Sequence, residues 1–259
     1  MKTKIATFWK YRFLLSNLIG RDLKVKYRRS KLGILWSVLN PLLMMLVMTA
    51  VFSKFFRMDI PNYPVYLLSG QLIFTFFNEA TSSAMGSVLF SSALIKKVYV
   101  PKYIFPLEKI CFSFVNMLFS MIALLVIILV TGAPIHPSMA AIGIPLCTVF
   151  VFCMGVGLFL SAAAVYFRDV MHFWSVIITA LTYATPLFYP ESIWRGTFMM
   201  YAGRCNPIYW YVTTFRECVL YGNLPSTLQI TLCSAFAAIA MVGGVYVFNK
   251  SQDNFILHI

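Results

Sequence analysis

Charged side chains are what this sequence has least of. Only 11% of its 259 residues are Asp, Glu, Lys or Arg, whereas 60% are apolar. A soluble globular chain typically carries about 25% charged residues. So few charges cannot cover the surface of a soluble domain, which excludes the soluble classes of enzyme and binding protein. The composition instead predicts a protein embedded in a membrane.

Phosphate-binding loops, metal-ligand clusters and catalytic pairs are missing as well. None of the 13 glycines is followed by Lys, so the sequence holds no G-x-x-x-x-G-K-[ST] loop, and energy from a nucleotide must come from a partner. The histidines, His136, His172 and His258, stand at unrelated spacings, which predicts no metal site. No Ser or Cys is recognisably paired with a base. We therefore expect no enzyme activity and no cofactor in this chain.

Long uncharged runs are abundant, and they predict six transmembrane helices. A span needs roughly 17 to 25 residues. A barrel is excluded because its strands would alternate polar and apolar residues. The predicted spans cover residues 33–56, 64–92, 107–131, 139–166, 171–189 and 226–249.

The few basic residues predict the orientation of these spans. With both termini in the cytoplasm, sixteen of the 21 Lys and Arg residues fall in inside segments, ten of them before residue 33. Basic residues accumulate on the cytoplasmic side of membrane proteins. We expect both termini inside and no cleavable signal peptide, because the first apolar run begins at Gly33 and is long enough to remain as a span.

The segment 8–31 has the pattern of an amphipathic helix lying in the cytoplasmic headgroup layer. Asp22 and Lys26 interrupt its apolar face. An alternative is that its cations only set the topology and bind anionic lipid, and the sequence leaves this open. The apolar face is formed by Phe8, Tyr11, Leu15, Leu18 and Ile19.

Glu79 is the one acid deep inside an apolar run. A carboxylate there is costly unless it faces water, a partner or the protein interior, which makes a functional role the default. The alternative is a neutral, hydrogen-bonded Glu that pins two helices. Arg168 and Asp169, adjacent at the cytoplasmic end of the fourth span, are expected to form a local ion pair.

Two of the six cysteines, Cys205 and Cys218, lie in or beside the predicted outer segment. An oxidising compartment would allow them to pair, and the sequence leaves this open. The other four fall within predicted spans, where a thiol packs as a small apolar group.

Aromatic residues make up 17% of the chain and gather near the predicted outer surface. There Pro186 and Pro190 break the fifth span, and residues 206–222 form an aromatic stretch that Arg216 and Glu217 interrupt. Short helices that dip into the outer leaflet and return are expected. Aromatic rings would suit a carbohydrate passenger.

Four pieces of the sequence, in this order, carry a resemblance to a known family. They are "RDLKVKYRRSKLGILWSVLNPLL" at 21–43, "LIKKVYVPKYIFP" at 94–106, "YFRDV" at 166–170 with "TPLFYP" at 185–190, and "NP" at 206–207. The chain resembles the membrane (permease) subunit of type-two ABC exporters for lipid-linked polysaccharides, which move O-antigen, capsule or teichoic acid.

The resemblance implies a transporter permease in the bacterial cytoplasmic membrane. It implies a homodimer that pairs with two copies of a separate ATPase, which binds ATP and Mg²⁺. The passenger would be an undecaprenyl-linked glycan, membrane lipids would surround the chain, and we expect no nucleic acid among its partners. Residues 1–32 would form an interface helix and 33–259 the six-helix transmembrane domain.

The resemblance also implies roles for single residues. The first and fifth spans would line the channel and bring Trp36, Tyr183, Phe188 and Tyr189 near the glycan. The lipid pyrophosphate would meet Arg28, Arg29 or Lys31. ATPase coupling would involve Lys96, Lys97, Val98, Tyr99, Pro101 and Lys102, and the outer gate would include Asn206, Pro207, Arg216 and Glu217.

Three other interpretations remain open at this point. An exporter of drugs or small lipids would share the fold and the ATPase. A membrane-embedded glycosyl- or acyltransferase would turn over without an ATPase. An ATP-independent channel or scaffold would need no nucleotide-binding partner.

Overall fold

The computed structural model describes residues 2–28, 30–56, 60, 62–98, 100–194 and 196–255, and these residues form helices and turns without a strand. The α-helices are α1 (Lys2–Tyr27), α2 (Trp36–Phe56), α3 (Tyr63–Phe90), α4 (Ser92–Ile95), α5 (Ile104–Thr131), α6 (Gly143–Tyr166), α7 (Val170–Tyr183), α8 (Met199–Cys205), α9 (Pro207–Arg216) and α10 (Thr227–Ser251). Short 3₁₀-helical turns cover Gly33–Leu35, Pro137–Ile142, Glu191–Trp194 and Gln252–Asn254. A π-helical turn covers Glu217–Tyr221. The predicted all-α fold is confirmed.

Each predicted span contains one long helix, namely α2, α3, α5, α6, α7 or α10. Four helical segments are long and apolar enough to cross a membrane, whereas α7 is shorter. The chain is therefore a multi-pass membrane protein. The helix α7 ends at Tyr183, six residues before the predicted end of its span, where the chain bends toward the buried Thr185 and Pro186.

The helix α3 lies at the centre of the bundle and packs extensively against both α5 and α6. Its sequence explains this position, because most of its apolar side chains are buried, while the polar residues Thr75, Ser82 and Ser83 and the terminal Phe90 are exposed. Large buried aromatics fill the core between α3, α6 and α9, among them Phe76, Phe77, Tyr211 and Phe215.

The helices α6 and α10 make the most extensive contact in the bundle, and small residues allow it. A Cβ added at Gly155 would lie 2.2 Å from the carbonyl carbon of Ala240, and one at Gly244 would lie 2.0 Å from the oxygen of Gly155. The two backbones thus touch directly, as small residues permit between membrane helices.

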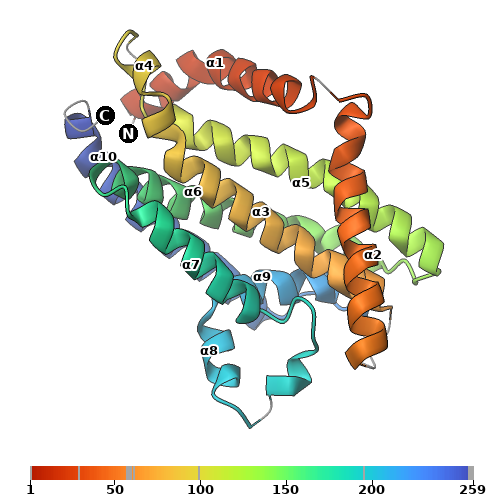
Figure 1. Ribbon diagram of the computed structural model, residues 1–259. Coiled ribbons are helices and arrows are strands. Elements are labelled where there is room, and N and C mark those ends of the chain that lie inside the picture. The colour runs from red at the N-terminus through yellow and green to blue at the C-terminus, as the bar shows by residue number, and fades with distance from the viewer. Residues whose placement is uncertain are drawn as a thin grey trace.

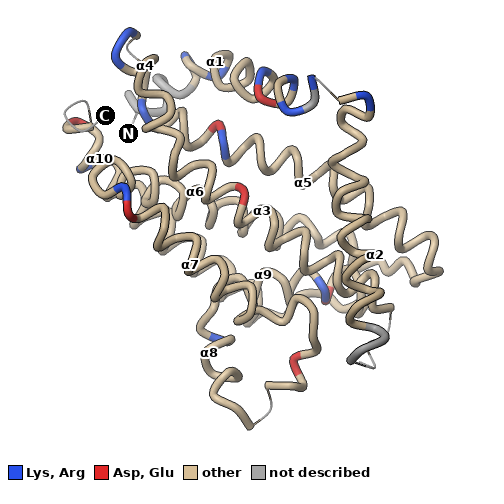
Figure 2. The backbone as a smooth tube through the Cα atoms, viewed as in Figure 1, with Lys and Arg blue, Asp and Glu red and all other residues tan. Residues whose placement is uncertain are grey.

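Both chain ends, α1 and α4 lie at the same end of the molecule (Figure 1). Figure 2 shows that most of the Lys and Arg residues gather there, on α1, on the turn after α4, and on the turn between α6 and α7. The helix α1 lies across this end and packs on α5. At the opposite end are α8, α9 and the connection from α7 to α8, where charges are few (Figure 2).

Candidate functional site

A cavity of about 470 Å³ lies between α2, α3 and α5, with the end of α1 at its rim. Asn40, Met44 and Thr75 are exposed lining residues, so the cavity opens on the molecular surface. The lining comprises Lys26, Trp36, Ser37, Asn40, Pro41, Met44, Gln71, Leu72, Thr75, Phe76, Glu79, Ser113, Asn116, Met117 and Ser120.

Helical spacing explains why three separate helices line one cavity with polar groups. On α3 the residues Gln71, Thr75 and Glu79 recur every fourth position, and on α5 the residues Ser113, Asn116 and Ser120 recur every third or fourth. Such residues lie on one face of a helix. Because polar groups facing lipid are costly, these faces turn toward one another and not toward lipid.

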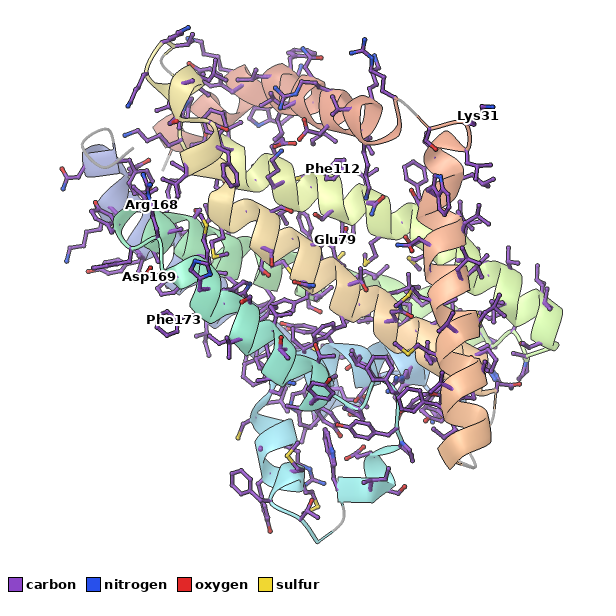
Figure 3. All side chains as sticks on the ribbon, in the orientation of Figure 1. Lys31, Glu79, Phe112, Arg168, Asp169 and Phe173 are labelled. Atoms are coloured by element: carbon purple, nitrogen blue, oxygen red, sulfur yellow. The ribbon has the colours of Figure 1, made fainter. Side chains whose placement is uncertain are left out.

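A chain of hydrogen bonds joins the three helices at this cavity. The Ser37 hydroxyl donates to Asn116 Oδ1 at 3.3 Å, and Asn116 Nδ2 donates to Glu79 Oε2 at 3.3 Å. The Ser120 hydroxyl donates to the Ser37 carbonyl at 2.9 Å. Glu79, which Figure 3 labels on α3, thus both pins α3 to α5 and lines a cavity, so the two interpretations of this residue meet.

One acceptor in the lining has no hydrogen bond within the described part of the chain. It is the buried side-chain oxygen Oε1 of Gln71. A buried amide oxygen without a donor costs about 1–3 kcal/mol. The Gln71 side chain lines the cavity, so a rotation of its amide would present this acceptor to a bound polar group.

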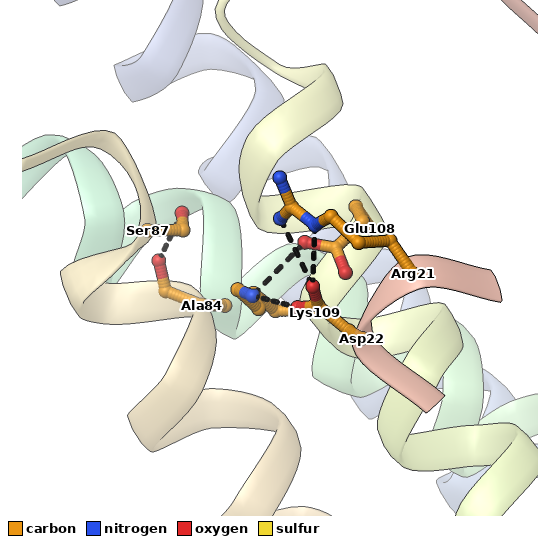
Figure 4. Close-up of polar contacts among 6 residues, drawn as sticks. All are labelled: Arg21, Asp22, Ala84, Ser87, Glu108 and Lys109. Carbon is orange, nitrogen blue, oxygen red and sulfur yellow. Dashed lines mark hydrogen bonds and ion pairs between the residues drawn. The ribbon is translucent and has the colours of Figure 1, made fainter. Parts of the chain in front are cut away.

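A charge cluster fixes α1 to α5 beside the rim (Figure 4). Lys109 Nζ donates to Asp22 and lies 3.2 Å from Glu108 Oε2, while Arg21 pairs with Asp22 at 2.9 Å. Partial burial alone would raise the pKa of the Asp22 carboxyl, but Lys109 and Arg21 hold that pKa below its ordinary value. Nearby, Lys26 Nζ lies 5.5 Å from the ring centre of Phe112 on α5.

This cluster explains why acid and cation interrupt the apolar face of the predicted amphipathic helix. That helix exists as α1, and Leu18 on its inner face is buried. Asp22 and Lys26 contact Lys109 and Phe112 of α5. The inner face of α1 therefore packs against α5, and it remains a candidate for contact with the membrane.

The four aromatic residues predicted to line the passenger path fall in two separate places. Trp36, at the start of α2, is 42% exposed and lines the cavity. Tyr183, Phe188 and Tyr189 lie at and beyond the other end of α7: the Phe188 ring stacks on Phe52 with centroids 5.6 Å apart, and the Tyr189 hydroxyl donates to the Tyr183 carbonyl.

The cations predicted for the lipid pyrophosphate lie at the turn from α1 to α2. Arg28 and Lys31 are both exposed, and Lys31 is labelled at this turn in Figure 3. Arg29 lies outside the described residues. Among the described residues that line the cavity, the cation is Lys26, which was not among the residues predicted for the lipid pyrophosphate.

The residues predicted for ATPase coupling divide into exposed and inward-facing groups. Lys96, Lys97 and Val98, just after α4, are exposed. Pro101 is half-buried, and Tyr99 lies outside the described residues. Lys102 turns inward: its Nζ donates to the Gln252 carbonyl and lies 5.6 Å from the Phe255 ring centre, which ties this loop to the C-terminal segment.

The residues predicted for the outer gate are mostly buried. Asn206 caps α9, since its side chain accepts from the Ile208 amide at 2.9 Å, and Pro207 is the first residue of that helix. Arg216, predicted as an interruption of an outer stretch, is only 3% exposed. Glu217 accepts from the Asn223 side chain at 2.9 Å.

The Arg216 guanidinium donates to three backbone carbonyls. It contacts the Tyr66 oxygen at 3.0 Å, the Pro186 oxygen at 2.7 Å and the Leu187 oxygen at 3.2 Å. It also lies 3.5 Å from the Tyr66 ring centre. A Cβ at Gly70 would lie 2.4 Å from its Nη2, so Gly70 leaves the room for it. Arg216 therefore joins α9, α3 and the turn after α7.

Arg168 and Asp169 are exposed at the turn between α6 and α7 (Figure 3). Among the side chains that the structure describes, no ion pair joins them. The Asp169 backbone carbonyl accepts from the amides of His172 and Phe173 and so begins α7. Cys205 and Cys218 are free thiols, the first exposed and the second buried.

Comparison with known proteins decides the family. The family model described as ABC-2 type transporter matches residues 14–220. This chain belongs to that family. The ABC-2 match covers α2 to α9 and most of α1, and thus every helix that lines the cavity.

Relatives of this ABC-2 chain include O-antigen and capsule exporters. An O-antigen export system permease protein RfbA of Klebsiella pneumoniae is 30% identical over 251 residues, which cover 93% of each chain. The protein of the same name from Myxococcus xanthus is 27% identical and covers 97% of each chain. A polysialic acid transport protein KpsM of Escherichia coli is 18% identical, covering 91% of this chain and 92% of its own.

Sequence reasoning did not find Lys26, Gln71, Asn116 or Ser37 as members of one site. One signal was available, because Gln71, Thr75 and Glu79 recur at helical spacing within a single span of this ABC-2 chain. Ser113, Asn116 and Ser120 recur in the same way on α5, but the meeting of these two faces with α2 depends on how the helices pack.

Proposed function

We propose that this chain is the transmembrane subunit of an ATP-driven ABC transporter that exports a lipid-linked polysaccharide across the bacterial cytoplasmic membrane. The observation that carries the proposal is the match of more than nine-tenths of the chain to proteins named for O-antigen export. The chain is then a permease and not an enzyme. The same relatives favour a polysaccharide over a drug or a small lipid as passenger.

The proposed topology has six spans with both termini in the cytoplasm. It is supported by the position of both chain ends beside most of the Lys and Arg residues (Figures 1 and 2), because basic residues accumulate on the cytoplasmic side. With this orientation α1 lies on the cytoplasmic surface, and α8 and α9 form the outer gate. The helix α7 reaches the outer surface through the bent segment that follows Tyr183.

The proposed assembly is a homodimer that binds two copies of an ATPase, which carry ATP and Mg²⁺. The exposed residues Lys96, Lys97 and Val98 are the part of the coupling loop best placed to dock on the ATPase. Arg28, Arg29 and Lys31 would attract the lipid pyrophosphate at the cytoplasmic surface. The glycan would then pass Trp36 first and Tyr183, Phe188 and Tyr189 later.

Deletion of the gene tests the proposal. We expect the surface polysaccharide to disappear and the lipid-linked glycan to accumulate inside the cytoplasmic membrane. A plasmid copy should restore export, and the same copy should fail when the partner ATPase carries an inactive phosphate-binding loop. Unchanged surface polysaccharide in the deletion strain would refute the proposed function.

A further inference from the structure

We propose that the cavity between α2, α3 and α5 is a sugar-binding site, which holds the sugars next to the lipid pyrophosphate before they enter the path to the outside. This inference rests on the proposed function, and it names the part of the passenger that the cavity recognises. The juxtaposition that carries it is one exposed Trp, several neutral hydrogen-bonding groups and one inner carboxylate, with a cation at the rim.

The size and position of the cavity suit a polar part of the passenger that arrives from the cytoplasm. Its volume of about 470 Å³ lies within the range of about 300–1,000 Å³ found for small-molecule sites. Glu79 lies eleven residues from the end of α3 at Phe90, which is about 16 Å along a helix. In the proposed topology the cavity thus reaches from the cytoplasmic surface to the middle of the membrane.

The hydrogen-bonding groups of the lining match sugar hydroxyls. A hydroxyl both donates and accepts, so it can donate to Glu79 or Gln71 and accept from the side chain of Asn40. The buried Gln71 Oε1 has no donor within the described residues, and a rotation of this amide toward the cavity would let it accept from a bound sugar. A hydrocarbon chain would leave this oxygen without a donor.

The acidic and basic residues of the lining, Glu79 and Lys26, favour a neutral ligand over an anionic one inside the cavity. Among the described residues that line the cavity, Glu79 is the one acid, and its Oε2 is a hydrogen-bond acceptor to which the oxygens of a pyrophosphate, themselves acceptors, cannot bond. Lys26 is the one cation of the same set, and it lies at the end of α1, beside the exposed Arg28. The anionic group is therefore held at the rim and the neutral sugars are held inside.

Trp36 supplies the apolar wall that a sugar ring requires. Its ring lines the cavity and is 42% exposed, whereas Phe76 on the opposite helix is buried. The flat C–H face of a sugar can stack on an exposed indole while its hydroxyls bond to the polar groups around it. Trp36 therefore acts on the sugar itself and not only as an interface anchor.

Binding to two lipids tests the inference on the purified full-length protein in nanodiscs. One probe is a polyprenyl pyrophosphate, and the other is the same lipid carrying two neutral sugars. We expect the wild-type protein to bind the sugar-bearing lipid at least about tenfold more tightly. Gln71→Leu should remove about fivefold of this gain, as the loss of one such hydrogen bond predicts, and Trp36→Ala should reduce it by a similar factor. Lys26→Gln should weaken the binding of both lipids equally.

Thr148→Val on α6 is the matched control, because the Thr148 hydroxyl bonds to carbonyls of its own helix and does not line the cavity. This variant should bind both lipids as the wild type does. Equal binding of the two lipids by the wild type, or a sugar-dependent gain that survives Gln71→Leu and Trp36→Ala in folded protein, would overturn the inference. Glycan export in the deletion strain is a separate measurement, so failure of the proposed function is seen independently.

Discussion

The two sides of the bundle are built in opposite ways. On one side α6 and α10 touch through Gly155, Ala240 and Gly244, with backbone atoms so close that no Cβ fits between them. On the other side α2 crosses α3 and α5 at an angle (Figure 1) and is separated from them by a polar cavity. There Ser37 and Asn116 supply a side-chain hydrogen bond across the interface.

This difference indicates which part of the protein can move. Direct backbone packing is lost entirely when two helices separate, so α6 and α10 form a fixed frame. Hydrogen bonds between side chains can be exchanged for bonds to water or sugar at little net cost. We therefore expect α2 to separate from its neighbours more easily than α6 separates from α10.

A side chain at Gly244 should produce the largest effect, because it breaks the frame. Gly244→Leu would place its Cβ 2.0 Å from the Gly155 oxygen, and backbone atoms cannot move aside as a flexible side chain can. We expect a loss of about 3 kcal/mol or more in the free energy of unfolding, measured by thermal unfolding in detergent and by protein level in the membrane.

The neighbouring residue provides the control. A Cβ added at Gly243, on the same helix, would meet no other part of the protein within 4 Å. Gly243→Leu should therefore leave unfolding and protein level close to those of the wild type. If both variants were equally damaging, general intolerance of α10 and not the backbone contact would be the cause.

Removal of Arg216 should have the second largest effect, because it releases α3 from α9 and from the turn after α7. Arg216→Met would leave the carbonyls of Tyr66, Pro186 and Leu187 without this donor. The Tyr66 and Pro186 carbonyls keep donors from the Ser69 and Tyr66 hydroxyls. The cost therefore comes from the lost hydrogen bonds to a charged donor and from the Leu187 carbonyl, and at about 1–3 kcal/mol for a buried group that loses its partner we expect a loss of about 3 kcal/mol in thermal unfolding.

Arg216→Lys separates charge from geometry. A Lys ammonium keeps the charge but cannot reproduce the planar fork that reaches three carbonyls. We expect it to recover less than half of the lost stability. Full recovery would show that the charge alone matters, and the fork would then have no special role.

The sequence predicts the positions of the helices α2, α3, α5, α6, α7 and α10 well, because each is an apolar run between charges, although α7 is shorter than its predicted span. It could not predict the partner of a distant polar residue. Asp22 and Lys109 are 87 positions apart and meet only because α1 lies on α5. Arg216 has the sequence context of a surface residue, and its burial depends on the carbonyls that α3 and the turn after α7 present to it.

Three of the four aromatic residues predicted for the passenger path lie around the end of α7, and the residues that enclose the cavity were not predicted as a set. The prediction treated each span separately, so it could expect Glu79 to face a cavity or a helix contact but could not name the residues of α2 and α5 opposite it. Only packing brings the polar faces of α2, α3 and α5 together.

Substitutions in the charge cluster at the rim should cost an intermediate amount of stability, and Lys109 and Asp22 should differ in how much stability they contribute. Lys109→Gln leaves Asp22 and the buried Glu108 side by side without their shared cation. We expect a loss of about 2 kcal/mol, between the values for exposed and buried pairs. Asp22→Asn leaves the pair of Glu108 and Lys109 intact and should cost about half as much. Thermal unfolding of both single variants and of the double variant measures the coupling.

Lowering the pH should destabilise the protein as Asp22→Asn does, which is the milder of the two substitutions. Because the folded state holds the pKa of Asp22 below its ordinary value, this residue contributes stability at neutral pH that is lost as the pH falls below about 4. The wild type should therefore lose more stability than Asp22→Asn between pH 6 and pH 3. Parallel losses in the two proteins would place the acid-sensitive group elsewhere.

The smallest effect on stability should come from the cavity itself, and it should be seen in the motion of α2. Asn116→Leu removes the bonds from Ser37 and to Glu79 and replaces them with an apolar contact of similar volume, so we expect a change of about 1 kcal/mol. Hydrogen exchange should rise about fivefold in α2 but remain unchanged in α10, because the frame does not depend on these bonds. Equal increases in both helices would mean that the bundle loosens as one body, and the cavity would then lack a wall that moves by itself.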